Sequence, residues 1–143
     1  MKKVFYLCAL AGLTLFAACQ QSATKEAVQP QQLAEEAIKI HDEIMPQIAH
    51  FDRTVLKIDN ILGNLDSLAK AKKDIDTNVI KADLTALKQN LEAATDNMMT
   101  WMRDYAPDST DVAYQKAEVE KIKAMKKQFE DVSLESNNKL GNL

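Results

Sequence analysis

Two groups of soft side chains are the part of this sequence best suited to chemistry. His41 and Met45 lie four residues apart, and Met98, Trp101 and Met102 lie within a second short segment. Residues three or four apart share a face of a helix, so each group would present its side chains together. Imidazole and thioether ligands suit Cu(I), and an indole face can cover a cation. The candidate ligands of such a soft-metal site, tested with Cu(I) or Ag(I), are His41, Met45, Met98 and Met102.

The same methionines have a simpler interpretation as core residues. Methionine fills irregular gaps in hydrophobic cores. Met98 and Met102 continue the apolar spacing of Leu84, Leu87 and Leu91, and they would therefore be buried with them. In this interpretation no cofactor is bound, and the aromatic ring between the two methionines covers one end of the core.

Met99 falls off this apolar stripe, so we expect it to be exposed or to contact a partner. Trp101, Tyr105 and Tyr114 are close to it in the sequence, where two predicted helices meet. Aromatic residues and methionine are enriched at the centres of protein interfaces. The candidate partner surface consists of Met99, Trp101, Tyr105 and Tyr114.

Catalytic motifs give little reason to predict an enzyme. The two histidines, His41 and His50, are nine residues apart, which places them on opposite faces of a helix. The sequence has no HExxH or CxxC motif, no glycine-rich phosphate loop and no serine nucleophile elbow. We therefore predict a protein that is not an enzyme.

Apolar residues recur at intervals of three and four in three segments, which predicts three amphipathic helices. The first runs over 33–71 and contains Pro46, where we expect a kink or a break. The second covers about 80–102, and the third carries its apolar residues over 112–132. The opposite face of the third helix is charged and predicted to be solvated, with residues such as Glu118, Lys121, Lys123, Lys127 and Glu130.

These helices predict an all-α fold, because nothing in the sequence has the alternation of a strand. Short connections require consecutive helices to pack antiparallel, so the expected architecture is an up-down-up three-helix bundle with a long, Pro-kinked first helix. An elongated helical hairpin that dimerises is the alternative, since the first helix is predicted to be longer than the third.

Cys19 predicts where the protein resides. It follows Lys2-Lys3 and an apolar run over 4–18, an order typical of a secretion signal and shorter than the about 20 residues of a membrane-spanning helix. A cysteine after two alanines resembles the lipobox of bacterial lipoproteins, which implies cleavage before Cys19 and acylation of its thiol. The predicted organisation is a signal peptide over 1–18, a lipidated cysteine and flexible tether over 19–32, and a helical domain over 33–143.

Charge and cysteine content argue against several further functions and kinds of site. The whole chain has a net charge of −3, and without the first eighteen residues it has −5. An acidic chain of this kind lacks the basic patch that binding to nucleic acid requires. Cys8 would be removed with the signal and Cys19 would carry lipid, which leaves no thiol for a disulfide or a thiolate metal site.

The segments His41–Pro46 and Met98–Met102 together resemble motifs of small helical lipoproteins of Bacteroidota, some of which carry the label "viral A-type inclusion protein". The resemblance covers about 33–134. It implies a lipoprotein with a helical domain and no assigned activity. In that group, early acidic residues after the cysteine send lipoproteins to the cell surface. Here the first acid is Glu26, which favours the periplasm-facing leaflet of the outer membrane.

The function predicted from the sequence is therefore a non-enzymatic envelope lipoprotein. Its helical domain would act at the outer membrane as a protein-interaction or structural module, with an envelope protein as partner. The alternative is a periplasmic protein that binds Cu(I) or Ag(I) through the His/Met/Trp cluster. A structural spacer that self-associates through its first helix, as a homo-oligomer, is the third hypothesis.

Overall fold

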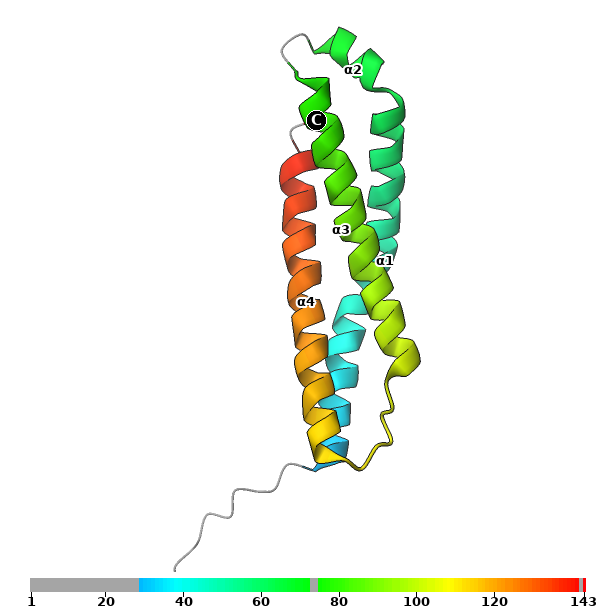
Figure 1. Cartoon of the computed structure of the whole chain (residues 1–143), viewed down its shortest axis with the longest axis vertical. Helices are drawn as coiled ribbons and strands as arrows, with labels where there is room; N and C mark the ends of the chain where they lie inside the picture. Colours follow the sequence, from blue (N-terminus) through cyan, green and yellow to red (C-terminus); the bar gives the residue numbers. More distant parts are fainter. Residues whose placement is uncertain (1–28, 73–74, 142) are drawn as a thin grey trace, which may run out of the picture.

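The computed structural model describes residues 29–72, 75–141 and 143, and all regular structure within these residues is helical. The four helices are α1 (Pro30–Gly63), α2 (Leu65–Ala71), α3 (Thr77–Asp104) and α4 (Val112–Leu140). The three long helices lie side by side, each contacting both others, and α3 runs opposite to α1 and α4 (Figure 1). The predicted all-α bundle is confirmed. The single helix predicted over 33–71 is instead two helices, α1 and the short α2.

Two prolines lie within α1, one at its start and one in its middle. The helix begins at Pro30, inside the segment predicted as tether, because proline is well suited to the first helical position and the Gln29 N–H donates to Gln32 Oε1 at 3.2 Å. The helix also continues through Pro46 without a break. Packing against α3 and α4 on both sides maintains the helix where proline removes one backbone hydrogen bond.

The other helix ends follow from local hydrogen bonds. The Asn64 side chain donates to the Asn60 carbonyl oxygen at 2.8 Å and ends α1 beside Gly63. Asp76 caps α3 by accepting from the backbone N–H of Asn78 at 2.9 Å. Asp111 caps α4 in the same way, accepting from two backbone N–H groups in its first turn. A carboxylate at this position satisfies donors that have no partner within the helix.

The hydrophobic core runs along the axis between α1, α3 and α4. At its centre the rings of Phe51 and Phe129 stack with centroids 4.8 Å apart and planes 10° apart. The residues of this core, ordered along the chain, are Leu33, Ala37, Ile44, Phe51, Ile58, Leu84, Leu87, Leu91, Ala94, Met98, Trp101, Val119, Ile122, Phe129 and Val132. Because α1 has 34 residues and α4 has 29 and the two pack together, the chain closes into a bundle and not an open hairpin.

Exposed ion pairs join the long helices across their seams. Glu36 and Glu43 on α1 pair with lysines of α4 at 2.8 and 2.6 Å, and Lys88 on α3 pairs with Asp59 on α1 at 2.6 Å. The hydrogen bond from Lys126 lowers the pKa of Glu43. Exposed ion pairs are screened by solvent and contribute little to stability, so these contacts mainly favour one register of the helices. Within the described residues, no helix has an apolar stretch long enough to cross a membrane.

Candidate functional site

A row of aromatic rings occupies the end of the bundle where α3 leads into α4. Trp101 and Tyr105 stack with centroids 4.5 Å apart, and Tyr105 and Tyr114 follow at 6.3 Å. Only 6% of Trp101 is exposed, while both tyrosines are half-buried. The structure therefore brings three of the four predicted partner-surface residues together, but with the indole ring inside the bundle and not on its surface.

Gln115 connects this aromatic row to the loop between α3 and α4 through hydrogen bonds. Its side chain is fully buried, and its amide nitrogen lies 3.1–3.3 Å from the carbonyl oxygens of Ala106, Pro107 and Ser109. Its amide oxygen accepts from the Tyr105 hydroxyl at 2.8 Å. Burial raises the pKa of that hydroxyl, which keeps it protonated as a donor. Buried polar groups need such partners, so these contacts indicate a structural role for this end of the row.

A buried carboxylate holds the indole ring from the side of α4. The Trp101 Nε1–H donates to one oxygen of Glu118 at 2.9 Å, and Lys121 Nζ lies 2.6 Å from the other oxygen. Glu118 is only 5% exposed, so its predicted place on a solvated face is wrong. The hydrogen bond to Glu118 raises the pKa of Lys121. A buried carboxylate is costly unless both oxygens are paired, and Trp101 supplies one of those partners.

His41 lies against the other side of the same indole ring. The ring centroids of His41 and Trp101 are 5.8 Å apart. His41 Nδ1 lies 2.9 Å from an oxygen of Asp42, so Nδ1 carries the proton in the neutral ring, and Nε2 keeps its lone pair. Nε2 is buried and, among the described residues, is the only buried side-chain nitrogen or oxygen without a hydrogen-bond partner.

The methionines predicted to join His41 differ in their burial. Met98 is fully buried in the core, and Met45 is partly buried against it. Met102 is 41% exposed, so the prediction that it shares the buried stripe of Met98 is wrong. Trp101 takes the buried position, because it has a partner on α4. The described residues contain no group of three or more His, Cys, Asp and Glu side chains that could hold a metal ion.

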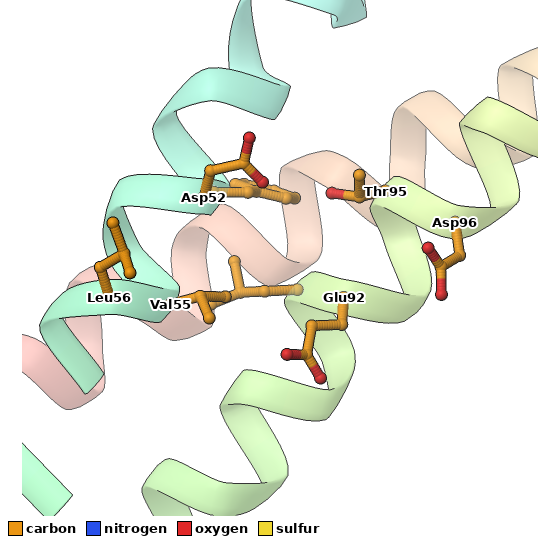
Figure 2. A pocket seen from close by; sticks show the side chains of 8 residues that line it. Asp52, Val55, Leu56, Glu92, Thr95 and Asp96 are labelled. Carbon is orange, nitrogen blue, oxygen red and sulfur yellow. The ribbon is translucent and has the colours of Figure 1, made fainter. Parts of the chain in front are cut away.

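A groove that the sequence analysis did not predict lies between α1 and α3. Its volume is about 540 Å³, and its lining consists of Phe51, Asp52, Val55, Leu56, Leu91, Glu92, Thr95 and Asp96. Figure 2 shows the labelled side chains of α1 and α3 on the two walls, with another helix passing behind them. Phe51 and Leu91 belong to the buried core, so the floor is apolar while carboxylates stand along the walls. One sequence signal was available: Leu56 is a large apolar residue off the apolar stripe.

Met99 extends this groove along α3. It follows Thr95 by four residues and Glu92 by seven, spacings that keep it on the same side of the helix. Met99 is 50% exposed, which confirms its predicted exposure, and Leu56 across the groove is 69% exposed. Met102 follows Thr95 by seven residues and shares the same side of α3. We define the α1/α3 face by Asp52, Leu56, Glu92, Asp96, Met99 and Met102. The four residues of the predicted partner surface therefore lie in two places. Met99 lies on this face, and the three residues of the aromatic row lie at the α3–α4 loop.

Comparisons with protein-family models, curated proteins and solved structures gave no match to this chain. Cys19, the predicted lipidation site, lies outside the described residues, as does most of the predicted tether.

Proposed function

We propose that this chain is a non-enzymatic envelope lipoprotein whose helical bundle binds another envelope protein. Its N-terminal sequence supports a lipid anchor at Cys19 in the periplasm-facing leaflet of the outer membrane. The part of the predicted tether, 19–32, that precedes α1 would hold the bundle within roughly 20 Å of the bilayer surface and leave its long faces accessible.

The observation that carries this proposal is the apolar surface left exposed on the α1/α3 face. Leu56, Met99 and Met102 each keep two fifths or more of their surface exposed on this one side. Burying one such side chain contributes about 1.5–3 kcal/mol, so the bundle leaves a substantial free energy of burial unused here. Large apolar side chains that gather on one face are typical of protein interaction sites.

Site-specific photo-crosslinking tests this proposal. A photoreactive residue at position 99 should give a discrete crosslinked species with an envelope protein, and Leu56→Ser should reduce its yield, because both positions contact the same partner. Position 134 is the matched control, since Leu134 is 61% exposed on α4. Equal products from both positions, or none from position 99, would contradict an interaction through the α1/α3 face.

Soft-metal binding is a second candidate function, favoured by the state of His41. A metal-binding histidine commonly donates its other ring N–H to a carboxylate, and His41 does so to Asp42 while Nε2 remains without a partner. The adjacent Trp101 ring would cover the ion. The thioether ligands proposed for Cu(I) are Met45, Met98 and Met102.

We expect Met45→Leu to weaken Cu(I) binding by about tenfold or more, because it removes a ligand. The volumes of the two side chains are similar, so stability should fall by less than about 1.5 kcal/mol. A competition titration with Cu(I), repeated with Ag(I), measures the affinity, and Trp101 fluorescence reports on the neighbouring ring. Met99→Leu is the control outside the ligand set. Equal affinities of wild type and Met45→Leu would exclude this site.

A further inference from the structure

We infer that the α1/α3 face binds a basic amphipathic helix of the partner protein, an inference that rests on the proposed interaction function. The shape of the face is the first reason. The groove between α1 and α3 is about 540 Å³ in volume and has Phe51, Val55 and Leu91 at its base. An amphipathic helix places its apolar stripe in such a groove between two helices, with anchors at intervals of three and four residues.

Charge is the second reason. Asp52, Glu92 and Asp96 stand along the groove, and no lysine or arginine lines it (Figure 2). Within the described residues, Asp52 and Asp96 form no ion pair. Glu92 reaches only Lys88, at 3.8 Å, and that ammonium lies closer to Asp59, at 2.6 Å. The carboxylates of the groove are therefore available to cations of a partner.

At the seam between α1 and α4, by contrast, the acidic side chains of α1 already have cationic partners. There, Glu36 and Glu43 are each within 2.8 Å of a lysine of α4, so the acidic side chains of α1 are neutralised inside the chain. On the α1/α3 face the same helix presents Asp52 beside exposed Leu56 with no cation opposite. On this face, exposed apolar side chains and carboxylates without a cationic partner lie together.

The side chains on the face suit a helix better than a flat surface. Methionine and leucine adapt to different apolar partners, and Met99 and Met102 continue the groove beyond Asp96. From Met45 to Leu56, α1 offers a path of about 18 Å at 1.5 Å per residue. About three turns of a partner helix fit along this path, with lysine or arginine beside its apolar stripe facing the carboxylates.

A second copy of this chain is a poor occupant. Two copies meeting through the same face would place Asp52, Glu92 and Asp96 against the same carboxylates. The face of α4 is also poorly suited, because five of its six lysines are engaged in ion pairs within the chain, namely Lys121, Lys123, Lys126, Lys127 and Lys139. Like charges opposite one another oppose association, so the complementary partner is cationic.

Fluorescence anisotropy with a labelled peptide tests this inference on the full chain in non-ionic detergent. The probe is an 18-residue helical peptide of leucine and lysine, with leucines on one stripe. We expect saturable one-to-one binding that weakens as salt is raised. A peptide of the same composition in scrambled order, without the stripe, should bind at least about tenfold more weakly, which corresponds to about 1.4 kcal/mol. Equal binding of both peptides would overturn the inference.

Charge variants locate the binding site. Asp52→Asn combined with Asp96→Asn should weaken the striped peptide by about tenfold, because two exposed ion pairs are lost. Asp108→Asn combined with Glu130→Gln changes the net charge equally at exposed positions outside the face, and should leave the affinity within about twofold. Equal weakening by both pairs would show attraction to overall charge, and the inference would fail.

Two single substitutions, Leu56→Ser and Met99→Ser, test the apolar contacts of the face. Each is expected to weaken binding of the peptide by about tenfold while leaving the circular dichroism spectrum unchanged. The result also separates this inference from the proposed function. A crosslinked partner at position 99 without binding of the striped peptide keeps the interaction module and rejects a basic helix as its partner. Peptide binding without any crosslinked partner supports the cationic specificity of the groove and rejects the envelope interaction.

Discussion

Replacing Trp101 with alanine is expected to lower the free energy of unfolding by about 3–5 kcal/mol. Trp101 is buried, stacks on Tyr105 and contacts His41. Its loss leaves a cavity at the end of the bundle and deprives the buried Glu118 carboxylate of the Nε1–H donor at 2.9 Å. Because a domain of this size is stable by only about 5–15 kcal/mol, this single change removes a large share of its stability.

Urea denaturation followed by far-ultraviolet circular dichroism measures this loss. Met99→Ala is the matched control two positions away, and its half-exposed side chain predicts a change of less than about 1 kcal/mol. Trp101→Phe keeps an aromatic ring, although a smaller one, but not the N–H, so we expect an intermediate loss of about 1–3 kcal/mol, mainly for the unsatisfied carboxylate. If Trp101→Ala costs no more than Met99→Ala, the ring is not a structural element of the core.

The helices were predictable because their apolar spacing persists over many turns. Their ends were less so, since each depends on one or two residues. Pro30 was assigned to the tether because proline usually marks a loop, yet at the first helical position it needs no hydrogen bond. Of the two outcomes predicted at Pro46, a kink or a break, the break does not occur, because contacts with two neighbouring helices preserve the helix. Local capping decided the first case and tertiary packing the second, and the apolar spacing of the sequence reveals neither.

In the candidate site, too, some features follow from the local sequence and others depend on tertiary packing. The exposure of Met99 followed from its place off the apolar stripe. The spacing left Trp101 and Met102 equally suited to the buried position, and Glu118 on another helix decided between them. Glu118 was itself assigned to the solvated face of the third helix, because its neighbours in sequence are charged. Its burial depends on a partner seventeen residues away, which helical periodicity does not reveal.

Gln115 and the α1/α3 groove could not have been found in the same way. A glutamine in a polar stretch has no signature of burial, and Gln115 is fixed by carbonyl groups that are oriented only once the loop has formed. The groove exists because α4 packs on the opposite side of α1 and α3. The sequence contained only the off-stripe Leu56 and Met99 as a hint, and it did not show that they would lie on one face.

Replacing Cys19 with serine is expected to abolish lipid attachment completely. A hydroxyl group is a much weaker nucleophile than a thiol, and the lipobox resemblance places the acylated thiol at this position. Cells supplied with an alkyne-tagged fatty acid should label the wild-type protein and not Cys19→Ser, and the mass of the wild-type protein should show loss of residues 1–18. Each buried methylene of an acyl chain contributes about 0.8 kcal/mol of membrane affinity, so loss of the thiol would release the bundle from the membrane.

Cys8→Ser is the control that distinguishes the anchor from the signal. The chain has two cysteines, and Cys8 lies in the segment that processing would remove. Its replacement should therefore leave labelling and the mature mass unchanged. Label on Cys19→Ser, or loss of label in Cys8→Ser, would contradict the anchor at Cys19. In that case the α1/α3 groove would keep its apolar floor and its carboxylates, but its partner would have to be sought away from the membrane surface.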